Sequence, residues 1–268
     1  MPRKAYPSDL TDAEWAELAP LLPTAKLGGR PRSVDLREIL NGLIYQLRVG
    51  GAWRMLPHDL PPYQTVYHYF NSWRKDGTWD RVHTHLREAV RVAAGREPTP
   101  SAAIVDSQSV KTTHRGGAKG YDAGKKVKGR KRHLAVDTIG LIIAVVVHTA
   151  TIQDPAGAKL VLAKVATGFP RLRLIWADGG YQDKIETWVK EKLHCLVQII
   201  KRSDKAKGFQ VLPRRWVVER TFAWLDRYRR LSKDYEFLPA TAEALIQVAM
   251  IHLMTRRLAR HKAQKTRA

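Results

Sequence analysis

The chain has 268 residues, enough for one large domain or two smaller ones, and 44% of them are hydrophobic, which excludes wholesale disorder. Lys and Arg number 47 against 25 Asp and Glu, a formal net charge of +22. So large an excess indicates a polyanionic partner, with nucleic acid ranked first, an anionic membrane second and an acidic protein third. The single cysteine, Cys195, excludes a disulfide framework and a cysteine-based zinc site. Because the first ten residues hold no apolar run and no stretch of 18 apolar residues occurs, we expect no signal peptide, no membrane span and a cytoplasmic protein.

The N-terminal part of the chain has the hydrophobic period of helices. Thr11 and Glu14 have the spacing of a capping box at the start of a first helix. Ser33 can cap a second helix, and the apolar period predicts two more helices before residue 95. We therefore expect residues 1–95 to form a small all-helical domain. Residues 96–101, which include two prolines, are expected to be a linker.

The hydrophobic period changes after the linker, where short buried strands alternate with helices. Apolar runs end at Asp106 and at Asp178, a hairpin is expected within 133–148, and a last buried strand within 195–200. This order predicts an α/β domain over 102–268, with a mixed five-stranded sheet flanked by helices and a long C-terminal helix.

Two of the predicted strands end on a carboxylate that is followed by a break, in the sequences IVDS and WADGG. If these strands are parallel neighbours, Asp106 and Asp178 lie side by side at the carboxyl edge of the sheet, where α/β proteins place ligands. Taken alone, each Asp also fits a plain strand-ending turn or a helix cap. Glu219 lies in an apolar stretch of a later helix, where it could face an active site or pair with Arg215. Three carboxylates suit Mg²⁺ or Mn²⁺, and two such ions can clamp both oxygens of a phosphodiester displacement.

The longer motifs around these residues resemble those of DDE-type insertion-sequence transposases, in the group around insertion sequence 5. The resemblance covers nearly the whole chain and rests on the sequences GAWRMLP (51–57), YQTVYHYF (63–70), IVDSQSVK (104–111), WADGGY (176–181) and VVERTFAWLDRYRRL (217–231). It implies an RNase H-like core in which Asp106, Asp178 and Glu219 are the catalytic, metal-binding triad. It also implies that the all-helical domain 1–95 is a helix-turn-helix-like DNA-binding domain. A homodimer or larger synaptic assembly, acting on the DNA of a prokaryotic nucleoid, is a further implication.

The chain departs from this family pattern around Glu219. Related transposases carry a Tyr seven residues before the Glu, an Arg four residues before it and a Lys seven residues after it. Arg215 fits, but Leu212 stands at the Tyr position and Asp226 at the Lys position, so the phosphate contacts of those two residues cannot be transferred. The candidates for a replacement cation are Arg227, Arg229 and Arg230.

Basic and polar residues outside the triad predict the DNA contacts. Nine Lys or Arg and one acid lie in 111–132, whose glycines predict a flexible loop that clamps the DNA backbone; a merely solvated loop is the alternative. One face of the third helix is polar and could enter a major groove or be an ordinary solvent face. The predicted DNA contacts are Gln64, His68, Asn71, Lys75, Lys111, Lys125, Lys126, Lys128, Arg130, Lys131, Arg132, Arg215 and Arg220.

Together these features predict a transposase that binds the ends of its mobile element, hydrolyses phosphodiesters to give 3′ hydroxyls and joins them to target DNA. Two alternatives remain open. One is a metal-dependent nuclease that cuts without joining, and the other is a non-catalytic DNA-binding protein with a vestigial core. The three carboxylates argue against the vestigial core, whereas the departures at Leu212 and Asp226 keep it open.

Overall fold

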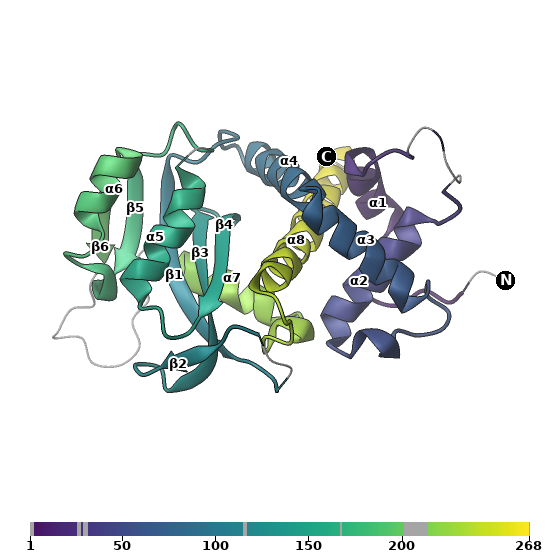
Figure 1. The fold of residues 1–268 in the computed structure, drawn as a ribbon. Coiled ribbons are helices and arrows are strands. Elements are labelled where there is room, and N and C mark those ends of the chain that lie inside the picture. Colours follow the sequence, from purple (N-terminus) through teal and green to yellow (C-terminus); the bar gives the residue numbers. More distant parts are fainter. Residues whose placement is uncertain are drawn as a thin grey trace.

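A computed structural model describes residues 3–25, 28, 32–114, 117–166, 168–200 and 214–267. The N-terminal part holds α1 (Asp12–Leu18), α2 (Leu36–Val49), α3 (Tyr63–Lys75) and α4 (Thr78–Ala93), with short 3-10 turns η1 (Ala19–Leu21) and η2 (Trp53–Met55). The remainder holds β1 (Ala102–Lys111), β2 (Gly120–Asp122), β3 (Val127–Asp137), β4 (Ile142–Thr149), α5 (Asp154–Val165), β5 (Leu174–Asp178), η3 (Gly179–Tyr181), α6 (Glu186–Leu193), β6 (Leu196–Ile200), α7 (Trp216–Asp226), η4 (Arg229–Leu231) and α8 (Pro239–Arg267). Figure 1 shows α1 to α3 on one side of the molecule, the sheet on the other, and α8 between them.

The strands form one mixed sheet, as expected from the sequence. Its order is β2-β3-β1-β5-β6, with β4 also paired to β3. β1 is antiparallel to β3 and parallel to β5, which is in turn parallel to β6. Within the described residues the sheet has six strands, one more than predicted, because the tiny strand β2 pairs with the start of β3. The described part of the basic segment 111–132 is thus largely strand and hairpin turn, not the flexible loop expected from its glycines.

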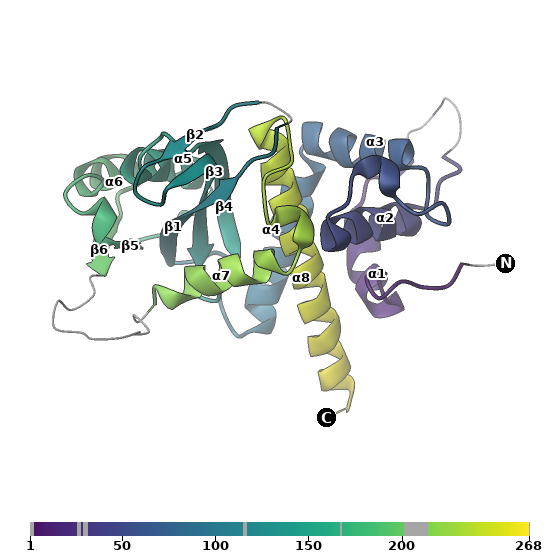
Figure 2. The ribbon, with the colours of Figure 1, turned by 90° about the horizontal axis from the view of Figure 1, so that it is seen from below.

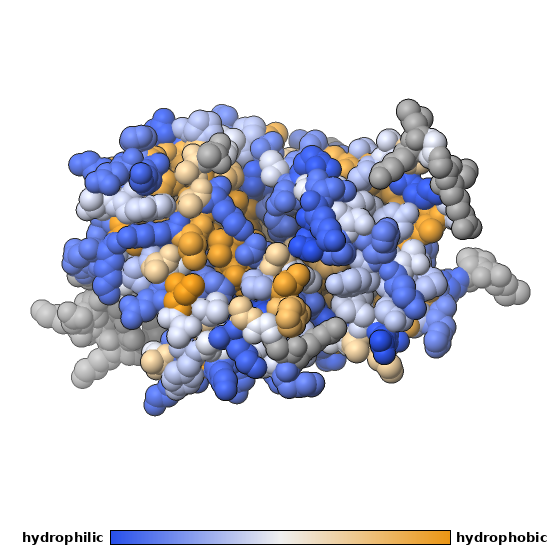
Figure 3. Space-filling view, viewed as in Figure 1, coloured by the Kyte–Doolittle hydropathy of each residue, from blue (hydrophilic) through white to orange (hydrophobic). Residues whose placement is uncertain are grey.

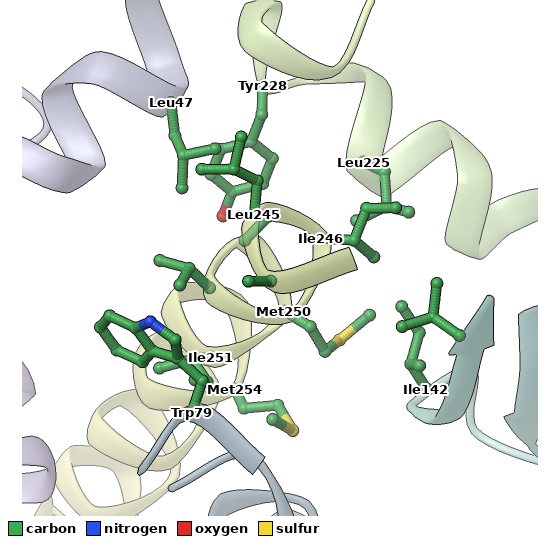
Figure 4. Packing of buried hydrophobic residues seen from close by; sticks show 14 of the residues in the cluster. Leu47, Trp79, Ile142, Leu225, Tyr228, Leu245, Ile246, Met250, Ile251 and Met254 are labelled. Atoms are coloured by element: carbon green, nitrogen blue, oxygen red, sulfur yellow. The ribbon is translucent and has the colours of Figure 1, made fainter. Parts of the chain in front are cut away.

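Helices cover both faces of the sheet, and each face has its own hydrophobic core. Figure 2 shows α5 and α6 on one face and α7 on the other, with α8 beside it. The first core packs α5 and α6 against residues such as Val105, Ile175 and Ala177. The second core joins the opposite face of the sheet to α7, α8 and the N-terminal helices. In Figure 4, side chains of α8 meet Leu47 of α2 and Trp79 of α4 as well as residues of α7 and β4.

The second core includes residues from both predicted domains, 1–95 and 102–268. The long helix α8 lies in the second predicted domain but packs against α1, α2 and α4 of the first and against β4. The division of the chain into two domains joined by a linker over 96–101 therefore stays a prediction. No helix of the described residues combines the length and the apolar character that a membrane crossing requires.

Local sequence explains where most helices begin and end. The Thr11 side chain accepts from Glu14 N and the Glu14 side chain accepts from Thr11 N, which confirms the predicted capping box. Ser33 was the wrong cap for the second helix, because Asp35 accepts from Arg37 N at 2.8 Å and α2 begins after it. The helix expected around Glu219 is α7, which ends at Asp226 and is followed by the separate turn η4.

The close approach of α5 to the sheet depends on a glycine. Gly157 faces the buried pair His133 and His148, and a Cβ atom at Gly157 would stand 2.5 Å from His133 Nδ1 and 2.6 Å from His148 Nε2. We predict that Gly157→Ala lowers the free energy of unfolding by about 1–3 kcal/mol, as overpacking of a tight core does. Gly42→Ala in α2 is the control, because its Cβ would meet methyl groups of Val66 at 3.1 and 3.6 Å and of Leu56 at 3.6 Å, and helix propensity favours Ala. Urea unfolding of both variants checks this, and equal effects would contradict it.

Candidate functional site

The parallel pairing of β1 and β5 brings two of the predicted carboxylates to one edge of the sheet. The register joins Ile104 to Trp176, and two further residues along each strand are Asp106 and Asp178. Asp106 Oδ1 accepts from the N–H of Ser107 at 2.7 Å. Asp178 Oδ1 accepts from Gly180 N at 2.8 Å and caps the turn η3, so its role as a plain cap is also present. The two carboxyl groups are close enough for the charge of Asp178 to act on Asp106.

Arg215 connects the third predicted carboxylate to this edge. Its Nη2 lies 3.4 Å from Asp178 Oδ2 and its Nε lies 3.7 Å from Glu219 Oε1, one turn further along α7. Glu219 is half exposed, with 52% of its side chain accessible, and Arg215 is 27% accessible. The pairing of Glu219 with Arg215 that the sequence allowed therefore exists, and the same guanidinium brings Glu219 toward Asp178.

The carboxyl group of Asp106 differs from an ordinary surface acid. Burial raises its pKa from the usual value of 3.8 to about 6, and the negative charge of Asp178 acts in the same direction. The hydrogen bond from Ser107 N and the positive charges of Arg215 and Lys125 act in the opposite direction. Without a bound cation, Asp106 is thus costly to ionise, which is typical of a carboxyl group held for a ligand of opposite charge.

This raised pKa makes the stability of the metal-free protein depend on pH. The unfolded chain ionises Asp106 near pH 4 but the folded chain only near pH 6, so the folded state is penalised progressively over this range and fully above it. We therefore predict that Asp106→Asn, which keeps an acceptor for Ser107 N, raises the melting temperature in EDTA at pH 8. The difference from wild type should shrink below pH 4. Melting curves at both pH values test this, and a pH-independent difference would contradict it.

The carboxylate oxygens of the candidate site suit a hard divalent cation, but the side chains are not arranged around a common metal position. Within the described residues, no group of three or more His, Cys, Asp or Glu side chains is arranged to hold a metal ion. Asp106 and Asp178 offer oxygen donors side by side, which fits Mg²⁺ or Mn²⁺. Glu219 is held by Arg215, so it would join them only after that guanidinium moved toward another anion.

The polar face predicted on α3 lies at the surface. Gln64, His68 and Lys75 are exposed, whereas Asn71 is half-buried. Asn71 Oδ1 accepts from Nε and Nη2 of Arg74, at 3.2 and 2.8 Å. This face is therefore accessible to a DNA groove, although the carbonyl oxygen of Asn71 is already in use.

The basic segment divides into exposed and buried residues. Lys111, Lys126 and Lys128 are exposed and line one hollow with His114, Lys119 and Tyr121. In Figure 3 the lower edge, where the β2–β3 hairpin lies, is mostly hydrophilic, whereas hydrophobic side chains gather left of centre over α5 and the sheet beside it. The exposed lysines thus lie together in a hydrophilic part of the surface.

Three other predicted DNA contacts are inside the protein. Arg130 is fully buried and donates to the carbonyl oxygens of Glu236 and Phe237, at 2.8 and 2.6 Å. Arg132 is 1% exposed and donates to Leu231 O at 2.6 Å. Lys131, on the other face of β3, is 4% exposed and paired with carboxylates. We therefore leave these residues out of any DNA-binding surface, because alternating strand positions point them into the two cores.

Some of the remaining predicted or candidate arginines near α7 already make contacts within the protein. Arg220 lies between the rings of Trp216 and Trp224 and donates to Ile139 O at 3.0 Å. Arg230, a candidate replacement for the missing lysine, is buried and bonded to Glu236. Arg227 and Arg229 are exposed, as is Asp226, and Leu212 lies outside the described residues.

One acidic residue near the site, the first residue of α5, was not indicated by the motifs. Asp154, at the start of α5, accepts from Ser107 Oγ at 2.9 Å and from Lys131 Nζ at 3.0 Å. Ser107 directly follows Asp106 in β1. The sequence signal that could have indicated Asp154 is an acid at the start of the helix that follows the hairpin. Its contact with Ser107 of β1 depends on tertiary packing, which the sequence does not show.

Comparison with known proteins assigns both parts of the chain. The family described as "Transposase DDE domain" matches residues 97–254, and "Putative transposase of IS4/5 family" matches residues 10–83. The chain is 31% identical over 117 residues to the "Insertion element IS402 uncharacterized 16.2 kDa protein" of Burkholderia cepacia, covering 40% of this chain and 76% of that one. It is 30% identical over 115 residues to the "Putative transposase for insertion sequence element IS402" of the same organism, covering 40% of this chain and 54% of that one.

A third relative is the "Uncharacterized protein y4sN" of Sinorhizobium fredii, 29% identical over 111 residues, which cover 33% of this chain and 89% of that protein. No solved structure matches the chain. The DDE match spans more than half of the chain and includes every strand, α7 and most of α8, in agreement with the RNase H-like core expected from the motifs. The chain therefore belongs to the DDE transposases of insertion sequences, in the group that the IS4/5 family represents.

Proposed function

We propose that this transposase binds the ends of its own mobile element, hydrolyses phosphodiesters there to give 3′ hydroxyls and joins those ends to target DNA. The observation that carries the proposal is that Asp106 and Asp178 share one edge of the sheet, and that Glu219 of α7 contacts the arginine that pairs with Asp178. The parallel pairing of β1 and β5 sets the first two side by side, and Arg215 connects Asp178 to Glu219. We assign the catalytic role to these three carboxylates.

In this proposal two Mg²⁺ or Mn²⁺ ions would be held by the three carboxylates, supplying an activated nucleophile and neutralising charge on the phosphate. Arg215 holds Asp178 and Glu219 in the metal-free protein and would turn to a phosphate oxygen of bound DNA, since Arg pairs equally well with both anions. Hydrolysis and joining are both in-line displacements at a phosphodiester, so one set of carboxylates serves both. Because two element ends are joined together, the active assembly would be a homodimer or larger.

The DNA surface that we propose combines the exposed face of α3 with the exposed lysines of the hairpin. Gln64, His68, Asn71 and Lys75 would read the element ends in the double helix, while Lys111, Lys126 and Lys128 would hold phosphates. Such an assembly would work where a prokaryotic cell keeps its DNA, in the cytoplasm.

This division of roles predicts different effects for two kinds of substitution. Lys126→Ala and Lys128→Ala should weaken binding to all DNA alike and reduce the slope of log Kd against log salt by about 1 each. Gln64→Ala should instead reduce the preference for element ends over other DNA, by ~1–3 kcal/mol if Gln64 makes a bidentate base contact. Competition titrations at several salt concentrations separate the two effects. If Gln64→Ala leaves the preference unchanged, α3 presents an ordinary solvent face.

Metal-dependent nicking is the first test of the enzymatic proposal. Purified protein, incubated with DNA that carries the ends of its element, should produce nicks with 3′ hydroxyls in Mg²⁺ and none in EDTA. Binding without nicking in either Mg²⁺ or Mn²⁺ would identify a non-catalytic DNA-binding protein instead.

A further inference from the structure

A network of charged and hydroxyl side chains lies directly behind Asp106 and involves the turn between β2 and β3. Ser107 occupies the next position in β1 and is 8% exposed. Its N–H donates to Asp106 Oδ1 at 2.7 Å, and its Oγ donates to Asp154 Oδ1 at 2.9 Å. The ammonium group of Lys125 lies 2.9 Å from Ser107 O and 3.0 Å from Ser107 Oγ. Three protein groups therefore fix the residue that directly follows Asp106.

The turn that carries Lys125 is itself locked to the sheet. Asp122 Oδ1 accepts from Lys125 N at 3.1 Å, and Asp122 Oδ2 accepts from Ser109 Oγ at 2.6 Å. Lys131 Nζ bridges Asp122 Oδ2 and Asp154 Oδ1, at 3.3 and 3.0 Å. Although burial alone would raise the pKa of Asp122, the hydrogen bonds from Ser109 and Lys125 and the charge of Lys131 lower it to about 2. The turn is thus anchored by a carboxylate that stays ionised.

Lys125 differs in this respect from the other lysines of the hairpin. Lys126 and Lys128 are also exposed, but among the described residues their side chains make no hydrogen bond or ion pair. The Lys125 side chain turns back to β1, and its charge acts on both Asp106 and Asp154. A lysine that served only as a phosphate contact would need no such partners.

We propose that Lys125 is a positioning residue for Asp106: by bonding both oxygen atoms of Ser107, it fixes the end of β1 and ties it to the DNA-facing hairpin. The inference rests on the proposed function, because Asp106 is one of its catalytic carboxylates. It separates Lys125 from Lys126 and Lys128, with which the sequence grouped it. Without the ammonium group, the Ser107 carbonyl loses its charged donor and the strand end can shift relative to Asp178. A displacement of even 1 Å at a reacting centre is costly in rate.

The test compares substitutions at three lysines in the full-length protein. Lys125→Met keeps the length of the side chain and removes its charge, and Lys125→Arg restores a cationic donor. Lys128→Ala removes a proposed phosphate contact from the same hairpin. Lys192→Ala, on the exposed side of α6, is the charge-matched control. For each protein, kcat for nicking is measured in Mg²⁺ with saturating element-end DNA, Kd for the same DNA is measured in EDTA, and the melting temperature is recorded.

We expect Lys125→Met to lose about 10- to 100-fold in kcat, the usual effect of removing an outer-shell partner of a metal ligand. Its Kd should change less than about threefold, and Lys125→Arg should recover most of the loss. Lys128→Ala should act on Kd, and Lys192→Ala should match wild type. If Lys125→Met lowers the melting temperature severely, Ser107→Ala is tested in its place. The inference then requires that Ser107→Ala also lowers kcat.

Two results would overturn the inference while leaving the proposed function intact. One is a kcat for Lys125→Met within threefold of an active wild type. The other is a loss confined to Kd, as for Lys128→Ala, which would make Lys125 a plain phosphate contact. A wild-type protein that does not nick DNA in Mg²⁺ or Mn²⁺ would overturn the proposed function itself, and the inference with it.

Discussion

Asp106→Asn, Asp178→Asn and Glu219→Gln are each expected to abolish both nicking and joining while DNA binding survives. In the proposed site Asp106 and Asp178 lie side by side and Glu219 is connected to Asp178 through Arg215, so each substitution removes a charge from that site. Such groups contribute several kcal/mol to the transition state, which corresponds to a loss on the order of a thousandfold or more. Because the proposed DNA contacts are lysines of the hairpin and the exposed face of α3, Kd should remain close to that of wild type.

Glu219 is the most exposed of the three carboxylates, which makes its substitution the most informative. Asp226, also on α7 and exposed, is the matched control, because Asp226→Asn removes a carboxylate that we place outside the catalytic set. We expect nicking by Asp226→Asn to stay within a few fold of wild type. Activity of Glu219→Gln within tenfold of wild type would remove Glu219 from the set. A strong loss in Asp226→Asn alone would assign the third carboxylate to that position.

The largest expected loss of stability follows removal of the buried ion pair between Arg91 and Asp137. Arg91 lies on α4, and Asp137, at the end of β3, is fully buried. The other oxygen of Asp137 accepts from Ile139 N and Leu141 N, at 3.0 and 2.8 Å. Arg91→Ala would leave the Asp137 carboxylate buried without its cation, which typically costs about 3–5 kcal/mol. For a chain of this size the melting temperature should fall on the order of 10 °C.

A surface pair on the same side of the molecule gives the matched control. Arg171 lies 3.5 Å from Glu97, and both side chains are largely exposed. Arg171→Ala should cost no more than about 1 kcal/mol, because solvent screens such pairs. Thermal unfolding of the two variants side by side measures the difference. An Arg91→Ala protein as stable as Arg171→Ala would mean that the junction between α4 and the sheet does not depend on this ion pair.

Local patterns predicted most elements of this fold and the edge where the site lies. The capping box at Thr11 is made by near neighbours, and the apolar runs before Asp106 and Asp178 are continuous, so their strands could be recognised without knowledge of the fold. The sequence left the parallel pairing of those two strands as a condition, which the register of Ile104 with Trp176 fulfils. Asp35 rather than Ser33 caps α2, so the helix begins two residues later than the sequence indicated.

Features that depend on distant partners could not be predicted in this way. Arg130 and Arg132 looked like part of a DNA clamp because positive charge in a glycine-rich segment is usually solvated. Their side chains instead donate to carbonyl oxygens about 100 residues later, at the end of η4 and in the segment that leads to α8. The bond between Lys125 and Ser107 likewise needs the hairpin to fold back over β1. The run of lysines and arginines therefore identified the basic segment, but it could not show which of these side chains face solvent.

Strand joining by the purified protein is the most direct test of the central claim. Element-end DNA with a free 3′ hydroxyl is incubated with a target plasmid in Mg²⁺, and the products are sequenced across the junctions. The account predicts covalent joints between the element end and the target, absent in EDTA and in Asp106→Asn. Nicked DNA without joints would identify a nuclease, and bound but unaltered DNA would identify a vestigial core; either result would contradict the account.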